Sequence, residues 1–191
     1  MEHHIDLIAC SFIREASHLE EIRGYISALG KYGQPGLISK IETLEAVLNF
    51  QSIMESSDGI MIARGDLGVE LPFEKIPFIQ KVILRECSRS KTYVITATQM
   101  LHSMVDHAVP TRAEVTDVSQ AVMDGTDAVM LSAESSVGNY PVQSTRVLDT
   151  IAKFAEIMHE QGESDFTLEE IIADPPFDKL DMEIAINNRS D

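Results

Sequence analysis

Short apolar runs rich in β-branched residues alternate along this chain with longer stretches in which apolar residues recur at helical spacing. Runs of this length and composition predict buried strands, and the stretches between them predict amphipathic helices. The strands are expected at residues 5–10, 37–41, 59–63, 93–97 and 128–131. The clearest helices are expected at residues 16–29, 43–54, 78–89 and 141–159. Strands that alternate with helices predict an α/β fold whose parallel sheet is either doubly wound or part of a (β/α)8 barrel.

Local signals set several boundaries of these elements. Gly30 ends the first helix, and a loop is expected around Pro72 and Pro77. Thr111 and Glu114 follow Pro110 with the spacing of a capping box, so a further helix is expected to begin there. The alternation stops near residue 160. We therefore expect one α/β domain over residues 1–160, and a linker with the start of another domain over residues 161–191, including a short helix near 182–188.

The composition of the chain excludes several kinds of binding partner. The chain has 31 acidic and 15 basic residues and a formal charge of −16, which argues against nucleic acid or an anionic membrane surface as a partner. No stretch approaches the ~20 apolar residues of a membrane span. The two cysteines, Cys10 and Cys87, do not form a C-x-x-C pair, and we expect them to be reduced, buried thiols of a cytoplasmic protein.

Polar side chains stand at the end of every predicted strand. In parallel α/β folds the carboxyl ends of the strands form the functional site, so residues there are expected to meet. The candidates, in chain order, are Ser11, Lys40, Glu42, Gly65, Asp66, Thr98, Ser132 and Glu134. Because side chains alternate along a strand, Lys40 and Glu42 are expected to point the same way, as are Ser132 and Glu134.

These residue types suit the binding of an anion together with a metal. Glu42 and Asp66 resemble the one or two carboxylates that hold Mg²⁺ in proteins. Lys40 would add positive charge, and Gly65 would let a ligand approach the backbone closely. Each residue also has a purely structural interpretation, such as an ordinary Lys40–Glu42 ion pair. To account for polar residues at all five strand ends, a separate structural interpretation would have to hold at each end, which favours a shared site.

Four motifs in order resemble the pyruvate kinase family. They are S-K-I-E at residues 39–42, D-G-I-M-I-A-R-G-D-L-G at 58–68, A-T-Q-M-L at 97–101 and P-T-R-A-E at 110–114. The resemblance runs from about residue 5 to 160. It implies a (β/α)8 barrel that transfers a phosphoryl group from phosphoenolpyruvate to ADP, giving pyruvate and ATP in glycolysis. It also implies Mg²⁺ (or Mn²⁺) and K⁺ as cofactors, and a homo-oligomer for the full-length proteins.

The resemblance assigns roles residue by residue. Lys40 and Thr98 would be catalytic, and both would bind substrate together with Gly65 and Asp66. Glu42 and Asp66 would hold the metal. Ser11, Ser132 and Glu134 are further candidates for lining the site. Two departures from the family's usual runs are Thr43, where it has asparagine, and Ala133, where it often has glycine.

The resemblance covers only barrel strands four to eight, and the family's potassium site lies outside it. We therefore expect the chain to be a fragment that is weakly active or inactive by itself. Two alternatives remain open at this stage. One is a barrel lyase that acts on pyruvate or oxaloacetate with a divalent metal, and the other is a non-catalytic fragment that assembles with another chain.

Overall fold

The computed structural model describes residues 5–30, 34–161 and 171, which form two compact units. The first unit comprises Met1–Thr98 and Asp124–Met130, and the second comprises Gln99–Met123 and Leu131–Asp191. The predicted linker and further domain at 161–191, with the helix near 182–188, fall almost wholly outside the described residues, so that boundary stays a prediction. No helix in the described part of the chain is long and apolar enough to cross a membrane.

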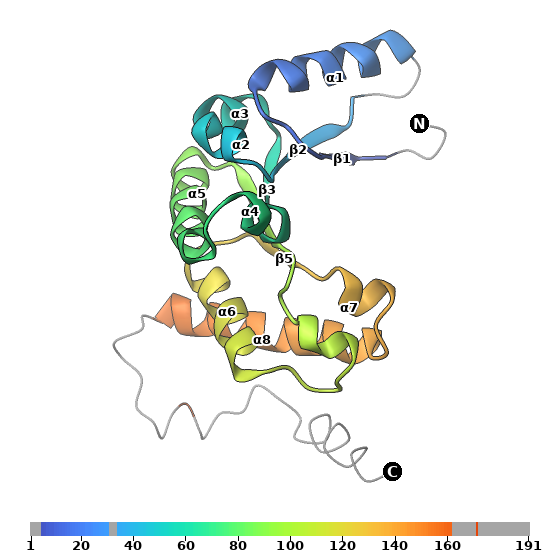
Figure 1. Cartoon of the computed structure of the whole chain (residues 1–191). Helices are drawn as coiled ribbons and strands as arrows, with labels where there is room; N and C mark the ends of the chain where they lie inside the picture. The colour runs from blue at the N-terminus through green and yellow to red at the C-terminus, as the bar shows by residue number, and fades with distance from the viewer. Residues whose placement is uncertain (1–4, 31–33, 162–170, 172–191) are drawn as a thin grey trace. The chain divides into compact units, whose positions relative to one another are not determined.

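The first unit holds a five-stranded parallel sheet in the order β1-β2-β3-β4-β5 (Figure 1). The strands are β1 (Leu7–Cys10), β2 (Gly36–Ile41), β3 (Gly59–Ala63), β4 (Tyr93–Ala97) and β5 (Ala128–Met130). The predicted α/β class and the five parallel strands are confirmed, and the sheet is open, with β1 and β5 at its edges. Three strand boundaries differ from the prediction: β1 starts at Leu7, after the exposed Ile5, β2 starts at Gly36, and β5 ends at Met130.

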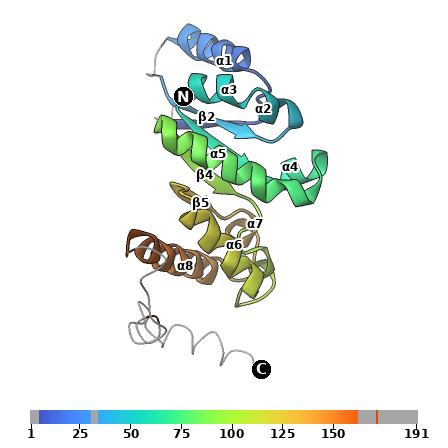
Figure 2. The ribbon, with the colours of Figure 1, turned by 90° about the vertical axis from the view of Figure 1, so that its left-hand side faces the viewer.

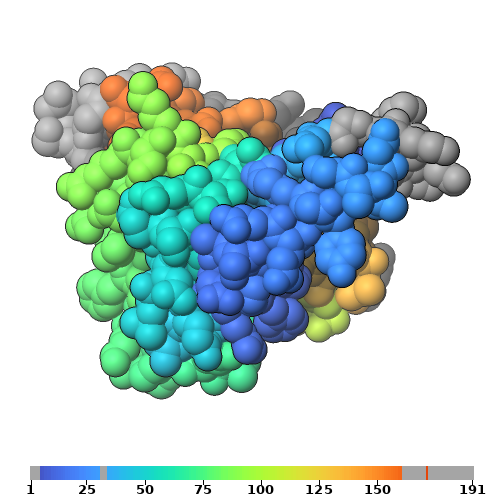
Figure 3. All heavy atoms as spheres, turned by 90° about the horizontal axis from the view of Figure 1, so that it is seen from above, coloured from blue at the N-terminus to red at the C-terminus, as the bar shows by residue number. Residues whose placement is uncertain are grey.

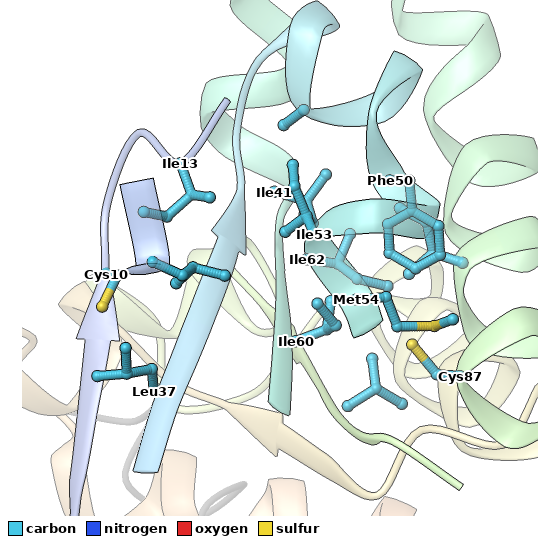
Figure 4. Packing of buried hydrophobic residues seen from close by; sticks show 14 of the residues in the cluster. Cys10, Ile13, Leu37, Ile41, Phe50, Ile53, Met54, Ile60, Ile62 and Cys87 are labelled. Carbon is cyan, nitrogen blue, oxygen red and sulfur yellow. The ribbon is translucent and has the colours of Figure 1, made fainter. Parts of the chain in front are cut away.

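Helices cover one face of this sheet, and their arrangement around the strands can be followed in Figure 2. They are α1 (Ala16–Leu29), α2 (Leu44–Leu48), α3 (Phe50–Ser56), α4 (Arg64–Glu70) and α5 (Ile76–Ser90), with a 3-10 turn at Phe73–Lys75. The main core lies between these helices and the sheet, and Leu37, Ile41, Ile60 and Ile62 contribute to it from the strands (Figure 4). Helices α1 and α3 pack side by side, and their blue and cyan atoms adjoin in Figure 3.

Three helix predictions need correction. The helix predicted at 43–54 is broken at Asn49, whose side chain donates a hydrogen bond to the carbonyl of Arg14 (2.9 Å). Helix α4 was missed, since only a loop was expected between the strand at 59–63 and the helix at 78–89, but the fully buried Leu67 anchors a helix there. Pro77 was expected in a loop, yet it lies in the first turn of α5, where its missing N–H has no intrahelical partner to lose.

Two aspartates clamp neighbouring strands in the same way. Asp58 precedes β3; its N–H donates to the carbonyl of Leu37 in β2, and its Oδ2 accepts from the Leu37 N–H (2.7 Å). Asp127 precedes β5 and makes the same two bonds with Val94 in β4. Arg23 also donates to Asp58 Oδ2 (2.7 Å). The N–H of Leu37, aided by the Arg23 guanidinium, holds the pKa of Asp58 below its usual value.

The second unit contains α6 (Arg112–Met123), α7 (Ala133–Ser136) and α8 (Pro141–Gln161), with a 3-10 turn at His102–Val105. Helices α6 and α8 pack against each other (Figure 1). The capping box is confirmed, because Thr111 Oγ1 accepts from the Glu114 N–H (3.2 Å) and Glu114 Oε2 accepts from the Thr111 N–H (2.7 Å). Burial opposes ionisation of Glu114, but hydrogen bonds from Ser103 and Thr111 outweigh it and lower the Glu114 pKa. Helix α7 was not foreseen.

Candidate functional site

Lys40 and Glu42 form an ion pair at the carboxyl end of β2. Strand alternation places both on the face opposite Ile41, which is buried under the helices. The Glu42 side chain is 1% exposed and that of Lys40 is 24% exposed, so the negative partner is nearly removed from water. Buried charges of this kind need partners of good geometry, and the adjacent strand end supplies them.

The two residues that follow β1 contact this pair. Ser11 Oγ accepts a hydrogen bond from Lys40 Nζ (2.9 Å). The backbone N–H of Phe12 donates to Glu42 Oε2 (2.6 Å), and Phe12 has a φ of 56°. Each Glu42 oxygen therefore has one protein partner. A carboxylate has about four acceptor positions, so capacity for a further ligand remains.

Asp66 lies in the first turn of α4, directly after β3, and its side chain is exposed. Strands β2 and β3 are neighbours with Ile41 opposite Ile62, so Glu42 and Asp66 follow the same end of adjacent strands. No group of three or more metal-ligating side chains occurs among the residues that the structure describes. Two carboxylates nevertheless fit Mg²⁺, which is commonly held by one or two of them with waters and substrate oxygens.

Thr98 follows β4 and is fixed through both its side chain and its backbone. Its Oγ1 accepts from the Gly65 N–H (2.7 Å) and donates to the Ala97 carbonyl (2.6 Å). Its φ of 70° is a genuine outlier for a β-branched residue, and Gln99 follows at 55°. Such strain persists only where surrounding contacts impose it, and it tends to occur at functional sites. The structure thus brings Gly65 and Thr98 together.

Arg64 is a contributor that the sequence interpretation missed. Its guanidinium donates to the Thr98 carbonyl from Nη2 (2.7 Å) and Nε (3.3 Å), and Nη1 donates to Oε1 of the buried Gln80 (3.4 Å). The bonds to the carbonyl hold the strained backbone of Thr98 from the first residue of α4. Of the R-G-D run at residues 64–66, only Gly65 and Asp66 were given roles from the sequence. A Cβ on Gly65 would meet Thr98 Oγ1 at an ordinary 3.5 Å, so contacts within the described chain do not require glycine there.

Ser132 and Glu134 belong to the second unit and are described within it. Glu134 is 1% exposed; its Oε2 accepts from the Ser132 N–H (2.9 Å) and its Oε1 from the Leu101 N–H (3.1 Å). The carboxylate therefore joins the segment before α7 to the segment that follows β4. This is a structural task that the sequence did not reveal. That Ser132 and Glu134 line a ligand site stays a prediction.

Comparisons with known proteins agree with the resemblance seen in the motifs. The family model described as pyruvate kinase, barrel domain, matches residues 1–145. The pyruvate kinase of Dictyostelium discoideum is 51% identical over 158 residues, covering 83% of this chain and 31% of that protein. That of Methanocaldococcus jannaschii is 47% identical over 161 residues, covering 84% and 36%. That of Geobacillus stearothermophilus is 50% identical over 148 residues, covering 78% and 25%. The chain thus spans only about a quarter to a third of the length of these relatives.

Proposed function

Since the chain belongs to the pyruvate kinase family, we propose that its first unit binds phosphoenolpyruvate or pyruvate together with Mg²⁺ or Mn²⁺. The reaction to which this binding would contribute is phosphoryl transfer from phosphoenolpyruvate to ADP, which gives pyruvate and ATP. The observation that carries this proposal is the Lys40–Glu42 ion pair at the end of β2, with Asp66 following the same end of the adjacent β3. K⁺, a homo-oligomeric assembly and a cytoplasmic location are proposed from family membership alone.

Lys40 and Glu42 would divide the work of binding. Glu42 and Asp66 would hold the divalent ion, which when bound supplies a Lewis acid for the substrate's carboxylate and phosphoryl oxygens. Lys40 donates to the substrate anion and stabilises the charge that develops on the enol oxygen as its bond to phosphorus breaks. Because the Glu42 side chain is nearly removed from water, its attraction for a bound cation would be screened little. Gly65 contributes a backbone contact to the substrate.

Thr98 is proposed to act where the enolate takes up its proton at carbon. Its own hydroxyl proton is directed at the Ala97 carbonyl, and its oxygen already accepts from the Gly65 N–H. In this arrangement the hydroxyl retains acceptor capacity but has no proton free to give. Thr98 would therefore orient a water that delivers the proton, while Arg64 fixes the Thr98 backbone.

Titration calorimetry on the purified chain tests the proposal directly. Mn²⁺ is expected to bind, and oxalate, which mimics the enolate of pyruvate, is expected to bind only after Mn²⁺. Glu42→Gln should lose the metal, and Lys40→Met should keep the metal but bind oxalate much more weakly, with an affinity that is still measurable. Glu45→Gln and Lys75→Met, at exposed positions on α2 and the 3-10 turn, serve as matched controls. Absence of oxalate binding to the Mn²⁺-loaded chain would refute the proposal.

A further inference from the structure

The turn at Ser11 and Phe12, between β1 and α1, contacts both members of the Lys40–Glu42 pair. We infer that Ser11 is a positioning residue: its hydroxyl orients the Lys40 ammonium toward the bound anion. This inference rests on the proposed function, and it adds a residue that acts on substrate binding without touching the substrate itself.

The donors of Lys40 explain why the hydroxyl matters. An ammonium has three N–H donors on a flexible stem that carries about 2 kcal/mol of rotamer entropy. Glu42 takes one donor and Ser11 Oγ takes a second at 2.9 Å. With two donors fixed, the direction of the third is set before any anion arrives. If one of these two partners is removed, the ammonium is no longer ordered in advance, and the entropy lost on ordering it reduces the affinity for the anion.

The chemical nature of the acceptor also fits this role. Glu42 already offsets the charge of Lys40, so a second carboxylate in place of Ser11 would leave the group with a net negative charge facing an anion. A hydroxyl accepts a hydrogen bond without adding charge. The side chain of Ser11 is exposed, so it contributes little to the core and its replacement leaves the packing unchanged.

The backbone conformation of the turn at Ser11 and Phe12 also favours the contacts with Lys40 and Glu42. Phe12 adopts a left-handed conformation that is uncommon for an aromatic residue, and the residue is 58% exposed, so packing of its side chain does not impose this conformation. The flanking Cys10 and Ile13 are buried in the main core and fix the turn at both ends. The strained conformation directs the Phe12 N–H at Glu42 Oε2, while Ser11 faces Lys40.

A double-mutant cycle between Ser11 and Lys40 tests the inference. The affinities for Mn²⁺, and for oxalate on the Mn²⁺-loaded chain, are measured for wild type, Ser11→Ala, Lys40→Met and the double variant. Ser11→Ala should weaken oxalate about tenfold, as expected for one charge-assisted hydrogen bond, and leave Mn²⁺ binding within about twofold. Ser11→Thr, which keeps the hydroxyl, should restore oxalate affinity. Ser88→Ala, at an exposed position on α5, is the control.

The cycle separates two kinds of failure. If wild type does not bind oxalate, the proposed function fails. If wild type binds oxalate and Ser11→Ala binds it equally well, the role of Ser11 is overturned and the proposed function stands. Equal weakening by Ser11→Ala in the wild-type and Lys40→Met backgrounds would also overturn it, because Ser11 would then not act through Lys40.

Discussion

Replacing Asp58 by alanine is expected to lower the free energy of unfolding of the first unit by about 2–3 kcal/mol. Leu37 is fully buried, and its N–H would lose the carboxylate that accepts from it at 2.7 Å. A buried donor left without its acceptor costs ~1–3 kcal/mol. The Arg23–Asp58 pair is partly exposed, at 35% and 47%, so its loss adds only ~0.2–1 kcal/mol.

An asparagine at the same position separates hydrogen bonding from charge. Asp58→Asn keeps an oxygen that accepts from Leu37 but has no charge for Arg23, so a loss of about 1 kcal/mol is expected at neutral pH. The folded-state pKa of Asp58 lies below its ordinary 3.8. The carboxylate's contribution is therefore present above the unfolded pKa and is lost as pH falls through the folded pKa. The difference between wild type and Asp58→Asn should shrink on acidification below about pH 4.

Urea unfolding followed by circular dichroism at neutral and acidic pH measures both effects. Glu55→Gln, at an exposed position on α3, is the matched control and should change the free energy of unfolding by less than ~0.5 kcal/mol. The reasoning is refuted if Asp58→Ala unfolds like wild type. It is also refuted if the deficit of Asp58→Asn is the same at both pH values.

Three further predictions concern caps, thiols and the second unit. Lys91 and Gly30 follow the ends of their helices with a positive φ, which costs little only for glycine. Measured by urea unfolding, Lys91→Gly should therefore raise the free energy of unfolding by about 0.5–1 kcal/mol, and Gly30→Ala should lower it by about 1 kcal/mol. Burial, with two nearby carboxylates, raises the pKa of the Cys87 thiol to about 12, and burial also raises that of Cys10. Ellman's reagent at mildly alkaline pH should therefore label neither thiol until urea is added, and rapid labelling of the native chain would contradict this. Glu134→Gln should destabilise the second unit by about 2 kcal/mol in thermal unfolding, because its amide NH₂ would face a buried backbone donor; an unchanged midpoint would contradict that role.

The strands and the Lys40–Glu42 pair were predictable because they depend on local pattern. Each strand is a short apolar run between polar residues, and period-two alternation suffices to place Lys40 and Glu42 on one face. The end of α1 at Gly30 was predictable for a similar reason, since glycine adopts the left-handed cap at no steric cost. These features need no knowledge of distant residues.

Features that depend on distant contacts were not predictable. The break at Asn49 depends on a bond to Arg14, thirty-five residues away in the sequence. Helix α4 contains Gly65 and Gly68, which lower helix propensity, and the burial of Leu67 overrides them. The left-handed conformation of Phe12 likewise has no signature in its residue type.

The two aspartate clamps have a signal in the sequence that was not used in the prediction. The runs D-G-I-M at 58–61 and D-A-V-M at 127–130 place the same residue before β3 and β5. Their similarity would have predicted a repeated structural role for Asp58 and Asp127. Arg64 gave a weaker signal, because an arginine beside a strand end has many structural uses and only its bond to Thr98 shows which one applies.

The Lys40–Glu42 pair also guards against misalignment of the strands. If β2 slipped by one residue against β3, every side chain of β2 would change face. Lys40 and Glu42 would then enter the core beside Ile60 and Ile62, at a penalty of several kcal/mol per buried ion. The residues proposed to bind the substrate would thus make a misaligned sheet unstable, so the same two charges would serve substrate binding and the fidelity of folding.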